Sequence, residues 1–144
     1  MLLLDVNIYV YAHREDSPHH QPARACLEEA LNGEAPVGHS PQALAGFLRI
    51  VTHPRIFVTP TDQPAALAFV EGILALPNAL LLHPGEAHWK IFADLCRKTG
   101  ARGNLIPDAW FAALALEHGC TWVSTDGDYT RFPGLSILNP LLPV

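Results

Sequence analysis

The chain has 144 residues, 49% hydrophobic and 16% charged, which indicates one compact domain over residues 1–144 and excludes a disordered chain. Nine basic and fourteen acidic residues leave a net charge of −5, which argues against nucleic-acid binding by bulk positive charge but not against a nuclease with an acidic metal site. The chain has three scattered cysteines, no signal-peptide pattern and no long apolar stretch. We therefore expect a cytoplasmic protein with no membrane span.

The first half of the chain alternates short apolar runs with helical patterns. Ser17-Pro18 and Ser40-Pro41 each resemble a helix cap followed by proline in the first turn, and Asn32-Gly33 is a typical helix end. The expected elements are a strand at 2–4, a helix at 7–12, a helix from 17 to about 31, a weak strand at 36–39 and a helix at 43–51. A further helix is expected to be capped by Thr61 or Asp62 and broken at Pro77-Asn78.

The second half continues the alternation. The expected elements are a strand at 79–82, an amphipathic helix around 89–96, a loop with Gly100 and Gly103, a helix at 104–117 closed by Gly119, a strand at 121–124, a turn or short helix at 129–132, and a strand at 135–138. This pattern predicts an α/β fold with three α/β/α layers and a short, mainly parallel sheet. In such sheets the ligand crevice lies at the carboxyl ends of the strands.

Several aspartates follow the expected strands. Asp5 comes directly after the first strand, where it could cap the next helix or line the crevice, and Asn7 could cap the same helix or orient Asp5. Asp126 and Asp128 follow the strand at 121–124, where they fit either a surface turn or a pair of acids that face one cation.

Asp108 lies near the start of the helix expected at 104–117. Asn104 is four residues earlier and is expected on the same helix face, although the helix dipole alone would favour an acid at this place. Distant acids that meet in space repel unless a cation neutralises them, and oxygen-only ligands favour Mg²⁺ or Mn²⁺ over zinc. We therefore predict that Asp5, Asp108 and Asp126 hold a divalent ion that activates water for attack on a phosphoryl group.

Four short segments carry a resemblance to a known family. They are Leu4-Asp5-x-Asn7, Phe47-Leu48-Arg49-x-x-Thr52-His53-Pro54-Arg55, Pro107-Asp108-Ala109 and Ser124-Thr125-Asp126-Gly127-Asp128-Tyr129. In this order and spacing the set resembles PIN-domain proteins, and most of all the VapC-type toxins of bacterial toxin–antitoxin pairs. The resemblance implies a metal-dependent ribonuclease that forms a homodimer and is silenced by a small antitoxin, whose tail occupies the active-site groove.

The resemblance also assigns roles to single positions. Asp5 and Asp108 match metal-binding aspartates, Asp126 matches a third or fourth acid, and Asp128 matches a less regular position. The polar residues that match positions orienting the acids or contacting the scissile phosphate are Asn7, Asn104 and Ser124 or Thr125.

The basic residues are the expected RNA contacts. The segment from Arg97 to Arg102 precedes the Asp108 helix and could flank the groove, although a solvated helix end would explain these cations equally well. The candidates are Arg49, Arg55, Arg97, Lys98 and Arg102.

One position departs from the family. The helix ahead of Phe47-Leu48-Arg49 usually carries a glutamate, and the chain has Gly46 there, with no other acid between Pro36 and Thr61. Three explanations of the missing glutamate stay open: a water fills its place, the second metal is bound weakly, or the nuclease is degraded. Glycine inside a helix costs up to about 1 kcal/mol relative to alanine, which indicates close packing or drift.

Two other functions stay open. The first is a binding module for RNA or an antitoxin that has lost catalysis together with the glutamate. The second is a phosphatase of the haloacid-dehalogenase type with Asp5 as nucleophile; that class usually has a second aspartate where this chain has Asn7, and a lysine on a later strand, whereas Lys90 and Lys98 are expected on a helix.

Histidines and tryptophans outside the motifs have simpler expected roles. His13, His19 and His20 are expected at the surface rather than in a metal cluster. Trp110 and Trp122 are expected in the core or a dimer interface rather than as base-stacking platforms.

Overall fold

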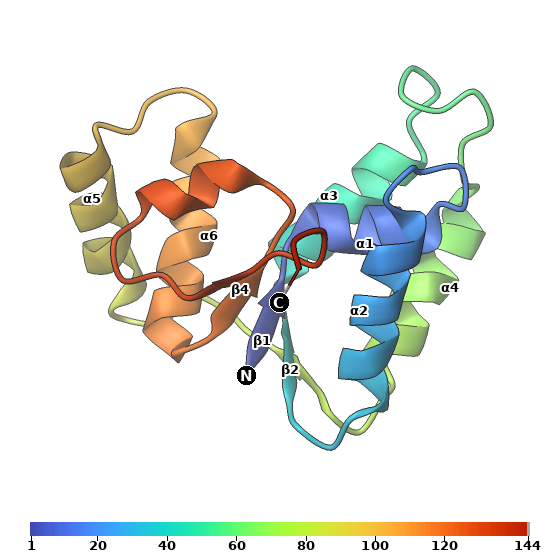
Figure 1. Cartoon of the computed structure of the whole chain (residues 1–144), viewed down its shortest axis with the longest axis horizontal. Helices are drawn as coiled ribbons and strands as arrows, with labels where there is room; N and C mark the ends of the chain where they lie inside the picture. Colours follow the sequence, from blue (N-terminus) through green and yellow to red (C-terminus); the bar gives the residue numbers. More distant parts are fainter. Residues whose placement is uncertain (144) are drawn as a thin grey trace.

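The computed structural model describes residues 1–143, which form helices on both sides of one sheet (Figure 1). Five parallel strands pair in the order β3-β2-β1-β4-β5. The strands are β1 (Leu2–Leu4), β2 (Val37–His39), β3 (Ala79–Leu81), β4 (Thr121–Val123) and β5 (Ile137–Leu138). The helices are α1 (Val6–His13), α2 (His20–Asn32), α3 (Pro41–Val51), α4 (Gln63–Leu74), α5 (His88–Thr99) and α6 (Leu105–His118), and η1 (Gly127–Arg131) is a 3-10 turn. The predicted α/β class and parallel sheet are confirmed.

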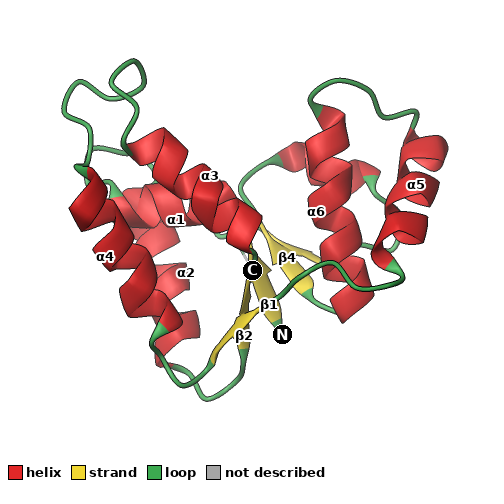
Figure 2. Ribbon diagram, turned by 180° about the vertical axis from the view of Figure 1, so that it is seen from behind, coloured by secondary structure: helices red, strands yellow, loops and turns green. Residues whose placement is uncertain are grey.

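The two helical layers consist of different parts of the chain. Figures 1 and 2 show α1 to α4 gathered on one side of the sheet and α5 and α6 on the other. After β3 the chain crosses to the far side of β1, so the strand order reverses between β1 and β4. Such a switch point opens a crevice at the carboxyl ends of the strands. Asp5 and Ser124 directly follow β1 and β4 at this point.

Local capping explains most of the helix boundaries. Ser40 Oγ accepts a hydrogen bond from the backbone N–H of Ala43 at 3.3 Å, and Asp62 Oδ1 accepts one from Ala65 at 3.1 Å. Gly119 ends α6 with a φ of 66°, a left-handed conformation that side chains with a Cβ disfavour. These three boundaries confirm the sequence prediction.

The prediction for the start of α2 is wrong. The helix begins at His20, and Ser17 and Pro18 lie in the turn that precedes it. Ser17 Oγ instead accepts a hydrogen bond from the backbone N–H of His19 at 3.2 Å. The hydroxyl therefore stabilises this turn rather than capping the helix, a competition that serine side chains often create.

Aromatic side chains fill the core around β4. Trp122 is fully buried, and its ring lies 5.3 Å from that of Phe111 and 5.2 Å from that of Tyr129. The small residues of α6 are also buried, which lets this helix pack closely on the sheet; they are Ala109, Ala112, Ala113 and Ala115. The core position predicted for Trp122 is confirmed.

His20 corrects the expectation of a surface histidine. Its side chain is 7% exposed, and its Nδ1 lies 2.9 Å from the carbonyl oxygen of Tyr11. The residue therefore holds the start of α2 against the end of α1. His13 is half-buried, and its ring packs edge-on against Phe47 and Phe69.

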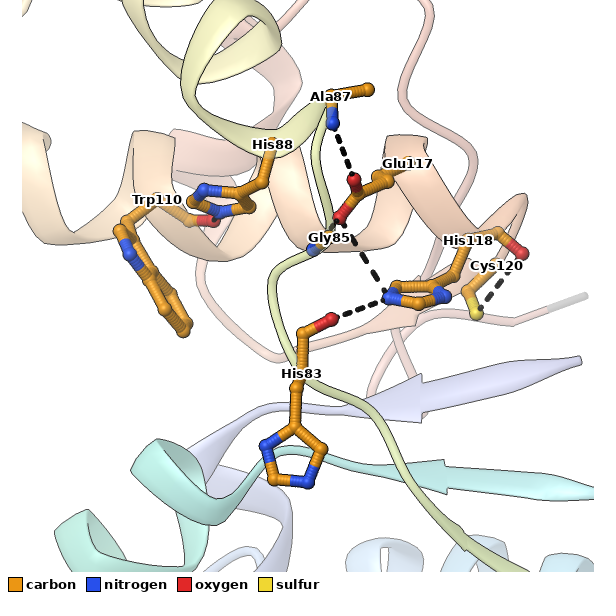
Figure 3. Close-up of polar contacts among 8 residues, drawn as sticks. All are labelled: His83, Gly85, Ala87, His88, Trp110, Glu117, His118 and Cys120. Atoms are coloured by element: carbon orange, nitrogen blue, oxygen red, sulfur yellow. Dashed lines mark hydrogen bonds and ion pairs between the residues drawn. The ribbon is translucent and has the colours of Figure 1, made fainter.

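The segment before α5 is attached to the last turn of α6 (Figure 3). The Glu117 carboxylate accepts hydrogen bonds from the backbone N–H groups of Gly85, at 2.8 Å, and Ala87, at 3.1 Å. A Cβ at position 85 would lie 2.8 Å from Glu117 Oε2, so a larger residue there would displace the carboxylate from this position. His118 Nε2 lies 2.8 Å from the carbonyl oxygen of His83 in the same segment. These contacts fix α5 against α6.

In the described part of the chain, no helix has both the length and the hydropathy that a membrane crossing requires.

Replacing Glu117 with alanine tests this attachment. The Glu117→Ala variant should lose about 1–2 kcal/mol of unfolding free energy, because it leaves two backbone donors at the start of α5 without their acceptor. Urea unfolding followed by circular dichroism measures the loss. Glu71→Ala on the exposed face of α4 is the matched control, and an equal loss in both variants would contradict the interpretation.

Candidate active site

Asp5 joins the end of β1 to the start of α1. Its side chain is 7% exposed, its Oδ1 accepts a hydrogen bond from the backbone N–H of Val6 at 2.7 Å, and its Oδ2 accepts one from the hydroxyl of Ser124 at 2.7 Å. The carboxylate therefore caps α1 and also faces the end of β4. The sequence left open whether Asp5 caps the helix or lines the crevice, and its side chain does both.

Asn7 and Ser124 hold Asp5 in place. The Asn7 amide donates to Asp5 Oδ2 and to Ser124 Oγ, both at 3.3 Å. Its Oδ1 accepts from the backbone N–H of Thr125 at 3.4 Å, and Ser124 Oγ accepts from that of Asp126 at 3.0 Å. Because these bonds join the ends of β1 and β4, the carboxylate of Asp5 has a defined direction.

Three further acids meet beside this network. Asp108, Asp126 and Asp128 each offer a carboxylate oxygen, and these oxygens all lie within 4.8 Å of one another. Asp126 caps η1 and accepts the backbone N–H of Asp128 at 2.9 Å. Asp108, in the first turn of α6, accepts a hydrogen bond from the Tyr129 hydroxyl at 3.2 Å. Side chains from α6 and from the loop after β4 thus converge.

A cavity of about 470 Å³ opens over the acids. Asp5, Asp108 and Asp126 line it, whereas Asp128 lies outside its lining. The remaining lining residues are Val6, Asn7, Val10, Tyr11, Gly46, Arg49, Ile50, Ile56, Phe57, Phe111 and Tyr129. The cavity therefore joins α1, α3, α6 and the loop that follows α3.

Burial and like charges raise the pKa values of the acids. Burial raises the pKa of Asp5 to about 6, and the nearby charges of Asp108 and Asp126 add to this effect, whereas the hydrogen bonds from Ser124 and Val6 oppose it. The pKa of Asp108 is also raised, mainly by burial and further by Asp126 and Asp128, against the hydrogen bond from Tyr129. A bound cation would relieve this repulsion, and the all-oxygen donor set fits a hard divalent ion.

Two residues singled out from the sequence lie away from the cavity. Asn104 precedes α6 at its exposed N-cap position, where its side chain makes no capping hydrogen bond. Arg102 is exposed in the loop before it and is not part of the cavity lining. The same helix therefore places Asp108 at the cavity and leaves Asn104 at the surface.

Some lining residues were not assigned from the sequence. Tyr129 belongs to the motif around Asp126, and its position just after the two acids was the signal that could have marked it as a partner of Asp108. Ile56 and Phe57 carried no such signal, because nothing in an apolar pair within a loop predicts which cavity it borders.

Gly46 lines the cavity at the position where the resemblance leads us to expect a glutamate. A Cβ at this position would lie 3.0 Å from Cγ2 of Val6 and 3.5 Å from its Cγ1. The absence of a side chain therefore lets α3 approach α1 closely. This contact supports close packing as the reason for glycine here.

Comparisons with known proteins agree with this geometry. The model of the PIN domain family matches residues 2–135. A VapC ribonuclease of Mycobacterium bovis is 45% identical over 141 residues, which cover 98% of this chain and 96% of that protein.

Solved structures share the fold at low sequence identity. A VapBC2 complex from Rickettsia felis bound to promoter DNA has a TM-score of 0.70 at 19% identity and covers 96% of this chain and 97% of its own. VapC20 of Mycobacterium tuberculosis, a sarcin–ricin loop cleaving toxin, has a TM-score of 0.65 at 14% identity, with 90% and 93% coverage.

The raised pKa of Asp5 has a measurable consequence for stability. Its pKa is about 6 in the folded protein, against 3.8 when unperturbed, so folding favours the protonated form and this carboxyl group destabilises the fold as pH rises. Both proteins are compared without metal. The unfolding free energy of Asp5→Asn minus that of the parent should therefore rise by about 2 kcal/mol from pH 4 to pH 7.

Comparing the variant with the parent isolates this group. His39 acts in the opposite sense over part of this range, because burial lowers its pKa to about 4, but it is present in both proteins and its effect cancels. Chemical unfolding in the presence of a chelator at several pH values measures the difference. A difference that does not change with pH would show that Asp5 titrates normally.

Proposed function

The chain belongs to the PIN-domain family, and from this premise we propose that it is a metal-dependent endoribonuclease that acts as the toxin of a toxin–antitoxin pair. The observation that carries the proposal is the convergence of Asp108, Asp126 and Asp128, whose carboxylate oxygens lie within 4.8 Å of one another. Two of these acids, Asp108 and Asp126, line one cavity together with Asp5. The ribonuclease name of the relative at 45% identity supports RNA as the substrate.

Asp5, Asp108 and Asp126 would hold Mg²⁺ or Mn²⁺, with Asp128 as a further ligand at the outer edge. Such an ion lowers the pKa of bound water and stabilises charge on the phosphoryl group. Ser124 and Asn7 orient Asp5 through their hydrogen bonds, and Tyr129 orients Asp108. Because these partners direct the carboxylates before any ligand arrives, the site is pre-organised.

Arg49 supplies the positive charge that faces the substrate. It is exposed on the cavity wall and forms no ion pair or hydrogen bond within residues 1–143, so its guanidinium is available to a phosphate. Lys98, by contrast, pairs with Asp94 at 2.9 Å on α5. The remaining basic candidates, Arg55, Arg97 and Arg102, would act only as outer contacts for a long RNA. With a net charge of −5, bulk attraction contributes little.

The proposed partners follow from the family. A small antitoxin is supported by the VapBC complex among the structural neighbours, and a homodimer and a cytoplasmic location complete the proposal.

The alternative functions find less support. For a haloacid-dehalogenase-type phosphatase, the two lysines would have to reach Asp5, but Lys90 and Lys98 both lie on α5, outside the cavity. A purely binding module finds less support, because Asp108, Asp126 and Asp128 still converge despite the glycine at position 46.

Removing Asp108 tests the enzymatic proposal. Asp108→Asn should reduce Mn²⁺-dependent cleavage of RNA by at least about a hundred-fold, because it removes a charged ligand. Gel-based cleavage assays with purified protein measure the rate, and circular dichroism checks the fold. Asp94→Asn on α5 is the matched control and should keep full activity. Undiminished cleavage by Asp108→Asn would reject the assignment.

Restoring an acid at position 46 tests what the glycine has removed. Any Cβ there contacts Val6, so the substitution is made as Val6→Ala with Gly46→Glu, and Val6→Ala with Gly46→Gln is the control. The glutamate adds a negative charge to the cavity wall and should tighten Mn²⁺ binding several-fold relative to the glutamine variant. Titration calorimetry measures the affinity, and equal affinities would show that position 46 lies too far from the ion.

A further inference from the structure

The cavity over the acids has an apolar wall that the proposed metal chemistry does not use. We call the side chains of Val10, Ile50, Ile56 and Phe57 the apolar wall; all four line the cavity together with Asp5, Asp108 and Asp126. Ile56 is 51% exposed, so apolar surface stays open to solvent directly beside a charged site. Exposed apolar surface next to converging polar groups is typical of a binding site.

Two polar side chains beside the apolar wall have no protein partner. Within residues 1–143, neither the Tyr11 hydroxyl nor the Arg49 guanidinium forms a hydrogen bond or ion pair, although both residues line the cavity. The other polar groups there are engaged, since Asn7 binds Asp5 and Tyr129 binds Asp108. Tyr11 and Arg49 can therefore donate hydrogen bonds to a ligand.

Arg14 holds the loop that carries half of the apolar wall. Its guanidinium lies 4.0 Å from the ring centre of Phe57 and donates to Thr61 Oγ1 at 3.2 Å. Asp16 fixes the same guanidinium through two bonds, at 2.9 Å and 2.6 Å. The backbone N–H of Thr61 also bonds to the carbonyl of Val51 at 2.8 Å. The loop is thus anchored, so the wall is formed before a ligand binds.

We propose that the apolar wall, with Tyr11 at its edge, binds the unstacked nucleobase next to the phosphate that is cleaved. The proposal rests on the ribonuclease function proposed above and adds the residues that would hold the base. One cavity of about 470 Å³ offers acids for a metal-bound phosphate, Arg49 for its charge, and an aromatic and aliphatic surface for the adjoining base. A base within a duplex stays stacked and cannot reach such a surface, whereas a base in a loop or single strand can.

Kinetics on single-stranded RNA with Mn²⁺ test the proposal. Ile56→Ala should raise KM about ten-fold with kcat within two-fold of the parent, since the wall contributes binding and not chemistry. Val58→Ala is the matched control: Val58 is fully exposed in the same loop and does not line the cavity. Tyr11→Phe should leave KM largely unchanged but weaken the preference for one base beside the cut.

An abasic nucleotide identifies what the wall binds. With RNA that lacks the base at the preferred position, the KM of the parent should rise by the same ten-fold. On this RNA, Ile56→Ala should raise KM no further. If the effects of Ile56→Ala and of the abasic nucleotide on KM multiplied, the proposal would be overturned, because the apolar wall and the base would then not be in contact. An unchanged KM in Ile56→Ala, or an equal effect of Val58→Ala, would overturn it as well.

Binding measurements separate this inference from the ribonuclease proposal. The Asp108→Asn protein keeps the apolar wall, and fluorescence anisotropy with labelled oligonucleotides should show that adding Ile56→Ala weakens binding about ten-fold for normal but not for abasic RNA. If the parent cleaves no RNA but this pattern holds, only the ribonuclease proposal fails. If cleavage is normal but Ile56→Ala weakens only the binding of a protein partner, the base site fails.

Discussion

The structure depends on one unfavourable arrangement, in which carboxyl groups are withdrawn from water and held close together at the switch point of the sheet. Asp5 follows β1, Asp108 lies on α6 and Asp126 lies in the loop after β4. Burial raises the pKa values of Asp5 and Asp108, and the charge of Asp126 raises both further. Such a cluster destabilises the metal-free fold, so it persists only where the surroundings hold it. The parallel pairing of β1 with β4 and the hydrogen bonds of Ser124 and Asn7 provide that support.

The rest of the fold reinforces this position. Trp122 of β4 packs between Phe111 of α6 and Tyr129 of η1, so the helix that carries Asp108 and the turn that Asp126 caps meet at one buried ring. At the other end of α6, Glu117 holds the segment that leads into α5. The helix that presents Asp108 is therefore held through Phe111 and through Glu117, and its alanines are buried.

The cavity has one acidic side and one mostly apolar side. The acids lie on the side of β1, β4 and α6, while α1, α3 and the loop after α3 contribute mostly apolar groups besides Asn7 and Arg49. Gly46 belongs to the second side and lets α3 lie against Val6 of α1. A glutamate there would have extended the acidic side; glycine instead brings the apolar elements together and leaves Arg49 as the charged group on α3.

Features set by neighbours in the chain could be predicted from the sequence. The caps at Ser40 and Asp62 and the glycine end of α6 depend on hydrogen bonds and backbone angles within a few residues, and the acids at the ends of β1 and β4 follow from the strand pattern. Tertiary structure alone decided the start of α2, the separation of Asn104 from the cavity, and the anchoring of the loop by Arg14. These depend on contacts between distant positions, such as Ser124 with Asp5, 119 residues apart, or Arg14 with Thr61, 47 residues apart. Local propensity carries no information about which distant partner a side chain will meet.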